Sequence, residues 1–283
     1  MKKSIVQIVN SQTVRMGNVK IGQPIPQGIL EEVNPFVLLH HATPKTMTAN
    51  GPGFFVPPHP HRGFEPVTFV FQGEVEHKDS LGNESIVKAG GVQWITAGSG
   101  IIHSEGNPKS FIEKGGTLEI IQLWINLPSS LKMTTPNYQA FDTENIPSIV
   151  QHKSRINIIS GEQNKLTGPI KSLTGITAFT VELEPEGIST FTLPEGHNAL
   201  AYQLNGDTLF NGNAMQAKQL LQLSPEGTEI EIKASKTSKL LVLAGAPIKE
   251  PKSMWGPYVM NTQTEIMQAL RDYETGKMGY LAG

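Results

Sequence analysis

The sequence predicts an all-β protein built from two successive β-barrels. Its 28 glycines and 20 prolines are scattered along 283 residues and divide the chain into short β-rich runs, without long stretches of helical periodicity. These runs fall into two separate series, which favours a duplicated barrel. A chain of this length can form two domains that each bury a core.

The first series of predicted strands lies between residues 65 and 130. Residues 67–71, 91–96 and 118–125 are apolar runs bounded by clusters of Gly, Asn, Asp and Pro, at the spacing expected of sandwiches and barrels. Residues 79–83 read Asp-Ser-Leu-Gly-Asn, which is typical of a hairpin turn.

A second series runs from about residue 177 to residue 243. Its predicted strands are residues 179–183, 199–204, 229–232 and 240–243. Both series consist of short β-rich runs, and we expect each series to form a barrel.

A short internal sequence similarity supports the duplication. Phe-Gln-Gly-Glu-Val at 71–75 resembles Leu-Asn-Gly-Asp-Thr at 204–208, with a strand, a turn glycine and a new strand in each case. Residues 126–165 are polar and punctuated by proline, as expected of an inter-domain connection. We therefore predict an N-terminal domain over residues 1–150 and a C-terminal domain over residues 151–283.

One helix is predicted, close to the C-terminus. Thr262-Gln-Thr-Glu265 has the pattern of a capping box, and Ile266, Leu270 and Tyr273 follow at helical spacing. We expect this helix to pack on a barrel.

Composition narrows the classes of function. The net charge is -2 and 17% of the residues are charged, so no basic surface indicates direct binding of nucleic acid. The absence of cysteine excludes disulfides, thiolate-bound zinc and iron–sulfur clusters. The first nine residues are too short an apolar stretch for a signal peptide, and no run of about 18 apolar residues predicts a membrane span. We expect a soluble, cytoplasmic protein in which any metal is bound by His and carboxylates.

Two pairs of side chains have the spacing of metal ligands. His59-Pro-His61 places two imidazoles at i and i+2, which point to the same side of an extended strand. His103-Ser-Glu105 repeats this spacing. An isolated His-x-His pair is often a surface or turn feature. Here apolar, glycine-rich strands accompany both pairs, and burying an uncompensated carboxylate such as Glu105 among them would be costly. If the strands are neighbours, the four side chains form a site suited to iron, copper, nickel, manganese or zinc.

Long motifs of this sequence resemble the pirin family of bicupins, proteins with two cupin (jelly-roll β-barrel) domains. The similarity extends over nearly the whole chain, in residues 34–41, 59–65, 79–83, 92–105, 123–128 and 255–261. The resemblance implies that His59, His61, His103 and Glu105 bind one mononuclear metal, usually iron as Fe(II). It also implies quercetin 2,3-dioxygenase activity, in which a flavonol ring opens with loss of carbon monoxide, and, in animals, redox-dependent binding to transcription factors.

Other polar residues have alternative roles. Glu65 is a rival ligand, although we expect it to orient ligands or to pair with Arg62. His40 and His41 follow an apolar run, where either a packing role or a place near the metal is open.

His77 is expected either to line the cavity or to face solvent, and we do not expect it to be a ligand. Trp94 and Gln93 are expected to pack in the core. His197 has no partner at i+2, so the second barrel is expected to bind no metal and to be a structural or regulatory half.

Two functions are consistent with these residues. The first is a metal-dependent dioxygenase acting on quercetin or a similar flavonol, with Glu105 as both ligand and catalytic base. The alternative is a non-enzymatic redox sensor whose iron state controls binding to a protein partner. A barrel that holds zinc or nickel for another small-molecule reaction is a third reading, since the ligands constrain the metal poorly.

Overall fold

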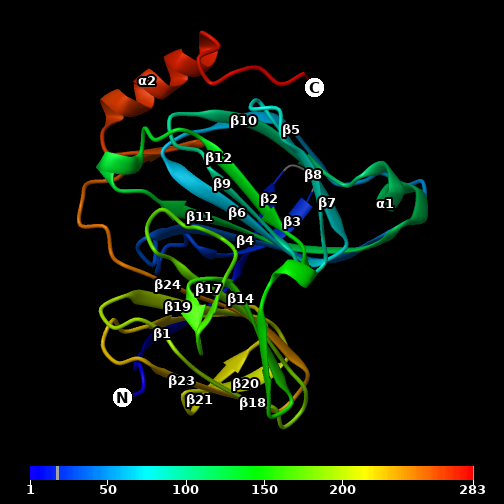
Figure 1. The fold of residues 1–283 in the computed structure, drawn as a ribbon, viewed down its shortest axis with the longest axis vertical. Helices are drawn as coiled ribbons and strands as arrows, with labels where there is room; N and C mark the ends of the chain where they lie inside the picture. Colours follow the sequence, from blue (N-terminus) through cyan, green and yellow to red (C-terminus); the bar gives the residue numbers. More distant parts are fainter. Residues whose placement is uncertain (17–18, 283) are drawn as a thin grey trace. The chain divides into compact units, whose positions relative to one another are not determined.

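A computed structural model describes residues 1–16 and 19–282. Two compact units divide the chain (Figure 1). Unit 1 comprises Met1–Asn18, Gly22–Leu39 and Glu144–Pro247, and unit 2 comprises Val19–Ile21, His40–Thr143 and Ile248–Gly283. Each unit is thus assembled from segments that are distant in sequence, whereas the division expected from the sequence was continuous and placed at residue 150.

Unit 2 is a β-barrel of two sheets, as the first series of strands predicts. One sheet has the order β5-β10-β7-β8 and the other β12-β9-β6-β11-β4-β3-β2; of the strands in this second sheet, β2 belongs to unit 1, and β3 and β4 contribute residues to both units. The strands are β2 (Gln12–Met16), β3 (Val19–Ile25), β4 (Phe36–Met47), β5 (Phe55–His61), β6 (Phe64–Gln72), β7 (Glu74–Asp79), β8 (Glu84–Lys88), β9 (Val92–Thr96), β10 (Ile101–Gly106), β11 (Gly116–Asn126) and β12 (Asn137–Phe141).

The predicted strands and turn of this unit are confirmed. Residues 67–71, 91–96 and 118–125 lie in or next to β6, β9 and β11, which pair with one another in the larger sheet. The turn between β7 and β8 is fixed by Asp79, whose Oδ1 accepts the backbone N–H groups of Leu81 at 2.9 Å and Asn83 at 3.0 Å. This is the local side-chain bonding that favours Asp in turns.

Unit 1 contains a second pair of sheets. Their orders are β1-β22-β19-β24-β17-β14-β13 and β18-β23-β20-β21. The strands are β1 (Ile5–Asn10), β13 (Ser148–Gln151), β14 (Ser154–Ser160), β17 (Thr177–Leu183), β18 (Ile188–Thr192), β19 (Asn198–Asn205), β20 (Asp207–Phe210), β21 (Asn213–Gln216), β22 (Gln219–Leu223), β23 (Glu229–Ala234) and β24 (Ser238–Gly245), with the short hairpin β15 (Glu162–Gln163) and β16 (Leu166–Thr167). All four strands predicted for the second series are present.

The two barrel interiors differ in chemistry. Apolar side chains such as Phe179, Phe210 and Leu221 form the cluster that fills unit 1. In unit 2 the buried residues include polar side chains on facing strands, among them Thr68, Gln93, His103 and Glu105. Burial of polar groups is costly unless they are paired, so these side chains indicate that the interior of unit 2 has a role beyond packing.

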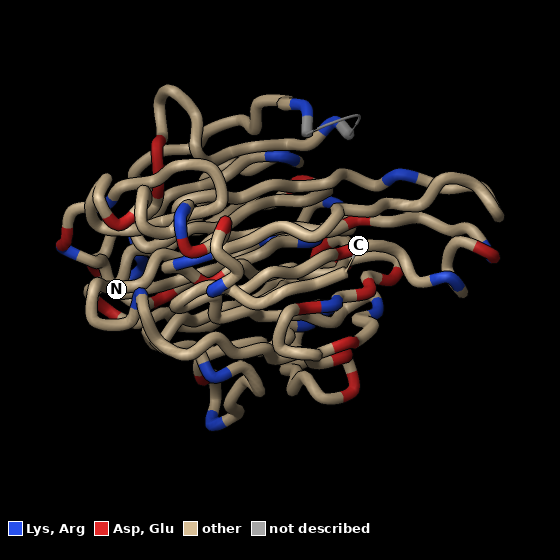
Figure 2. The backbone as a smooth tube through the Cα atoms, turned by 90° about the horizontal axis from the view of Figure 1, so that it is seen from above, with Lys and Arg blue, Asp and Glu red and all other residues tan. Residues whose placement is uncertain are grey.

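The remaining elements surround these sheets. They are α1 (Lys109–Lys114), the 3₁₀ turns η1 (Ser129–Leu131) and η2 (Thr143–Asn145), the hairpin β25 (Ser253–Trp255) and β26 (Tyr258–Met260), and α2 (Gln263–Glu274). None of the helices within the described ranges has the length and apolar character needed to cross a membrane. Along the backbone, Lys and Arg are interspersed with Asp and Glu (Figure 2).

Helix α2 begins with the predicted capping box. The Thr262 hydroxyl accepts the Glu265 N–H at 3.2 Å, while the Glu265 carboxylate accepts the Thr262 N–H at 2.8 Å. Ile266 and Leu270 pack in a cluster that includes Ile102 of β10, beside which the red helix lies in Figure 1. Tyr273 of the predicted apolar face is 38% exposed, so it lies at the edge of this contact.

The C-terminal segment is tied to the strand end that carries His61. The Val259 N–H donates to the Arg62 carbonyl at 3.1 Å. The buried Lys132 ammonium donates to the Gly63 and Val259 carbonyls at 2.9 and 2.7 Å, and to Asn126 Oδ1 at 2.7 Å. Together these bonds hold Arg62 and Gly63 beside Val259, which is nearly 200 positions away in sequence.

An ion pair between Arg62 and Asp272 adds to this attachment. The guanidinium donates to the carboxylate at 2.9 Å, and the two side chains are 4% and 10% exposed. Hydrogen bonds from Lys277 and Arg62 hold the pKa of Asp272 well below its usual value. The contribution of this carboxylate to stability is therefore complete above about pH 4 and is lost as the pH falls below it.

We predict that Asp272→Asn lowers the free energy of unfolding by about 3 kcal/mol, because it leaves a buried guanidinium without its counter-charge. Urea unfolding at neutral pH measures this change. Glu274→Gln, at an exposed position of the same helix, is the control and should leave the midpoint unchanged. Equal midpoints for the two variants would contradict the assignment.

Candidate metal centre

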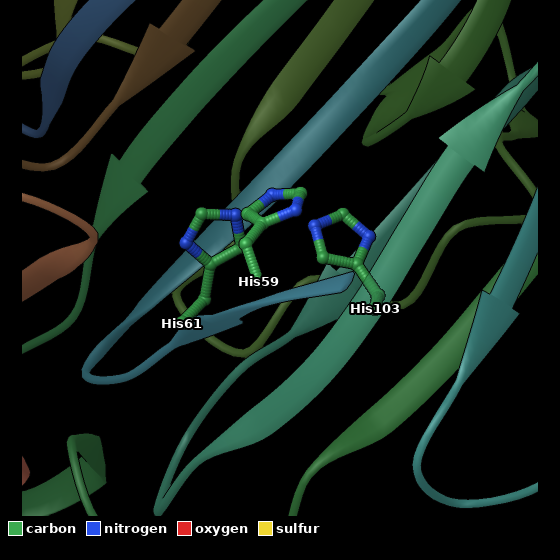
Figure 3. Close-up of side chains that lie close together, drawn as sticks. All are labelled: His59, His61 and His103. Carbon is green, nitrogen blue, oxygen red and sulfur yellow. The ribbon is translucent and has the colours of Figure 1, made fainter. Parts of the chain in front are cut away.

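Strand pairing brings three histidines together inside unit 2. Strands β5 and β10 are antiparallel neighbours, and His59 lies directly opposite His103. His61 is two residues from His59, so strand alternation turns both rings to the same side. Figure 3 shows the three rings gathered from these two strands. The convergence expected from the two i, i+2 pairs is thus present for the histidines.

The three rings are close enough to share one ion. Their centroids are 4.8 Å apart for His59 and His61, 4.3 Å for His59 and His103, and 4.9 Å for His61 and His103. One nitrogen from each ring lies within 4.8 Å of the others. This histidine triad (His59, His61 and His103) offers three imidazole donors, which suit iron, copper, nickel and zinc.

Burial keeps the inner rings neutral. His103 is fully buried and His61 is 2% exposed, while His59 is half-buried. Burial lowers the pKa of His61 to about 3, with a further contribution from the neighbouring His59. Burial also holds the pKa of His103 well below its usual value. Neutral imidazoles have the free lone pairs that metal binding requires.

Several nitrogens of the triad are free for a ligand. Among the described residues, Nε2 of His61 and both ring nitrogens of His103 are buried without a hydrogen-bond partner. A buried polar atom without a partner costs free energy. An ion bound here would remove that cost, so the donor set fits a metal.

Two backbone carbonyls orient the rings of β5. His59 Nδ1 lies 2.9 Å from the Pro57 oxygen, and His61 Nδ1 lies 3.3 Å from the Pro257 oxygen. Because a carbonyl only accepts, each Nδ1 carries the proton and each Nε2 keeps its lone pair. Pro257 belongs to the C-terminal segment, and no sequence spacing indicated that it would contact His61.

Glu105 lies beside His103 and His77, and not in the group that His103 forms with His59 and His61. Its carboxylate groups with His103 and His77 within 4.8 Å, and not with His59 and His61. The register of β10 on β5 shifts here, because Glu105 pairs with Val56 rather than with the residue two before His59. Pro57 and Pro58 stand at the shift, and prolines cannot donate to a strand ladder.

Three neutral donors hold the Glu105 carboxylate. Oε1 accepts hydrogen bonds from Thr68 at 3.1 Å and from Gln93, and Oε2 accepts one from Gln122 at 3.2 Å. The sequence alone did not indicate this role for Thr68, Gln93 and Gln122. Their signal was a polar side chain among the apolar residues of each of three strands, β6, β9 and β11.

His77 lines the interior of the barrel. It is fully buried, which excludes the solvent-facing alternative. Its ring stacks on Tyr138 with centroids 4.2 Å apart, and its Nε2 lies 3.1 Å from Asp79 Oδ2.

The structure also gives the positions of Glu65 and His41, which were considered as possible site residues. Buried Glu65 accepts a hydrogen bond from Thr96 at 2.8 Å, while Arg62 pairs with Asp272. His41 lies 3.1 Å from Glu119 in a second buried polar cluster of unit 2.

His40 is half-buried, and burial lowers its pKa to about 4. Trp94 is fully buried, as expected of a core residue. His197 is half-buried in unit 1.

Comparisons with known proteins identify the family of the chain. The Pirin family profile matches residues 18–125, and the profile for the pirin C-terminal cupin domain matches residues 178–279. A Pseudomonas aeruginosa protein named "Putative quercetin 2,3-dioxygenase" is 37% identical over 249 residues, or 87% of each chain. Pirin-1 of Arabidopsis thaliana is 37% identical over 274 residues, covering 94% of this chain and 88% of its own.

A solved structure extends the similarity to the fold. The crystal structure of a quercetin 2,3-dioxygenase from Acinetobacter baumannii superposes with a TM-score of 0.93, at 36% identity and over 100% of both chains. The profiles and the superposition agree with the two barrels described above. The chain is a member of the pirin family of bicupins.

Proposed function

We propose that unit 2 binds one mononuclear divalent metal through His59, His61, His103 and Glu105, and that the resident ion is iron(II). The observation that carries this proposal is the set of buried, unpartnered imidazole nitrogens on His61 and His103. Three imidazoles and one carboxylate leave coordination positions open to other ligands. Several similar proteins are named quercetin 2,3-dioxygenase, and a reaction with dioxygen favours a redox-active ion.

We further propose that the reaction is the oxidative opening of a flavonol such as quercetin. The ion would supply a Lewis acid that binds a deprotonated substrate and promotes its reaction with dioxygen. The protein residues supply orientation, a proton acceptor and a buried environment. Support comes from the similarity to named quercetin 2,3-dioxygenases over the full chain.

Glu105 is the proposed acceptor for the substrate hydroxyl proton. A carboxylate has about four lone-pair positions, and Thr68, Gln93 and Gln122 occupy three of them. The remaining position is on Oε2, which can accept a proton or contact the ion. The neutral donors also fix the plane of the carboxylate, which is the kind of orientation a general base requires.

Access to the site is from the half-buried side. His59 is the most exposed member of the triad. A cavity of about 260 Å³ near Glu105 is lined by Phe55, Lys78 and Ser104. Ser104 and Lys78 alternate with the buried His103 and His77, so this cavity lies on the outward side of the sheet, and none of its lining residues belongs to the triad. The half-buried edge of His59 is therefore the proposed entrance for a flavonol.

The direct test is anaerobic reconstitution with iron(II), followed by elemental analysis and measurement of oxygen uptake with quercetin. We expect stoichiometric iron, oxygen consumption matched by carbon monoxide release, and loss of both metal and uptake in Glu105→Ala. Bound iron without oxygen uptake would refute the dioxygenase. Absence of bound metal in the wild-type protein would refute the site itself.

The ligand assignment predicts a contrast between the two barrels. His61→Ala should lose metal while the fold remains intact, because the cores of both units are built from other, apolar strands. His197→Ala should leave the metal content unchanged. Metal analysis and circular dichroism of the two variants provide the check, and unfolding of His61→Ala or metal loss in His197→Ala would count against the assignment.

The donors around Glu105 give a separate prediction. Gln122→Ala should weaken metal binding by about 10–100-fold, as is usual when a residue that orients a ligand is removed. The matched control is Gln72→Ala, because Gln72 donates to the buried Glu119 at 2.9 Å, outside both candidate ligand groups. Competition with a fluorescent chelator measures the affinities, and equal affinities in the two variants would exclude a role for Gln122.

A further inference from the structure

Trp124 of β11 carries a buried hydrogen-bond donor that the proposed function leaves unused. The side chain is 9% exposed, and its indole Nε1 is buried without a hydrogen-bond partner in the part of the chain that the structure describes. An indole N–H can only donate, and a buried one usually has an acceptor. A phenylalanine ring would pack here without the cost of an unpaired donor, so the indole indicates a role beyond packing.

The register of the larger sheet places Trp124 on the face that carries the donors to Glu105. Gln122 pairs with Thr68 of β6, and Thr68 pairs with Gln93 of β9. These three side chains therefore form one row across the sheet, on the side where the Glu105 carboxylate lies. Trp124 is two residues from Gln122, and side chains at i and i+2 lie on the same face of a strand.

The indole lies against the ring of His61. The two ring centroids are 5.3 Å apart, at an interplanar angle of 71°. Phe64 packs on the indole with centroids 4.4 Å apart, and it also contacts the His61 ring at 5.1 Å. These contacts hold the indole beside one of the proposed metal ligands. A molecule at an open position of that centre would share the buried interior with the indole N–H.

The acceptor that suits this N–H best is an anion. A neutral donor that is fixed in a buried interior stabilises negative charge more strongly than the same donor in water. Arg62 follows His61 in sequence, but its guanidinium pairs with Asp272 and its Nε donates to the Ser99 carbonyl at 2.7 Å. The indole N–H has no such competing partner among the described residues.

We propose that Trp124 is a binding residue of the candidate metal centre, and that its indole N–H donates a hydrogen bond to an oxyanion at an open coordination position. The inference rests on the proposed function, because the ion holds the oxyanion there. The ligand class is a deprotonated hydroxyl group on an unsaturated carbon, as in the anion of a flavonol. Transfer of the hydroxyl proton to Glu105 leaves negative charge on this oxygen, which the indole N–H then stabilises.

Binding of acetohydroxamate, a small chelating oxyanion, to the zinc-loaded protein tests this role without turnover. Zinc accepts His and carboxylate ligands and has no redox chemistry. Trp124→Phe should raise the Kd of acetohydroxamate about 10–100-fold, as expected when a hydrogen bond to a charged group is lost. It should still bind one zinc ion per chain. Isothermal titration calorimetry measures the Kd, and a Kd equal to that of the wild-type protein would overturn the inference.

The matched control is Trp94→Phe. Trp94 is fully buried, and its Nε1 also lacks a partner among the residues described. It directly follows Gln93 in β9, so it faces away from the row of donors to Glu105. Trp94→Phe should keep the wild-type Kd for acetohydroxamate. An equal loss of affinity in the two variants would overturn the inference, because any buried indole would then have the same effect.

The indole N–H signals in the NMR spectrum of isotope-labelled protein decide the question even if Trp124→Phe fails to fold. The chain has three tryptophans, and Trp94→Phe and Trp255→Phe assign their signals. Acetohydroxamate should move the Trp124 signal of the zinc-loaded protein to lower field and leave that of the exposed Trp255 in place.

Two kinds of failure are distinguishable in these experiments. Bound zinc with an unmoved Trp124 signal, or without binding of acetohydroxamate, would overturn the role of Trp124 and leave the proposed metal ligands standing. A wild-type protein that binds no zinc would refute the metal centre itself, and the role of Trp124 with it.

Discussion

The antiparallel pairing of β5 with β10 is the constraint on which the candidate site depends. It sets His59 opposite His103, and strand alternation then places His61 on the same inner face. A one-residue slip of either strand would turn its inward side chains outward. The surrounding structure resists such a slip, because hydrogen bonds from Val259 and Lys132 hold the end of β5 and the backbone just after it. The C-terminal segment thus contributes to the site through the position of the backbone as well as through the Pro257 carbonyl.

The contrast between the two barrels follows from what each interior is made of. The cluster in unit 1 is apolar and filled by aromatic and branched side chains, so its burial contributes to stability. Unit 2 buries imidazoles, amides and carboxylates, which cost free energy unless each finds a partner. Glu105 and Asp79 have such partners, whereas His61, His77 and His103 each keep nitrogens without one among the described residues. A barrel that retains these unpaired donors indicates a binding function.

Sequence patterns predicted the local features well and the long-range ones poorly. The strands, the Asp79 turn and the Thr262 capping box depend on neighbouring residues, and all were foreseen. The convergence of the three histidines followed from strand parity. The separation of Glu105 from His59 and His61 did not, because the register of β10 on β5 shifts at Pro57 and Pro58.

Other features had no local signal at all. The composition of each unit from distant segments depends on contacts across most of the chain. The same holds for the contact between His61 and Pro257. His77 was recognised as a candidate for the cavity, but its bond to Asp79 and its stacking on Tyr138 required the folded barrel.

X-ray absorption at the iron edge of the iron(II)-loaded protein tests the central claim most directly, because it reports the atoms bound to the ion. Three imidazole nitrogens from the triad, with oxygen donors completing the shell, are the predicted result. Replacing His59 by alanine should remove one of these imidazoles from the spectrum. An iron shell without imidazole nitrogens, or one unchanged in the His59 variant, would contradict the account.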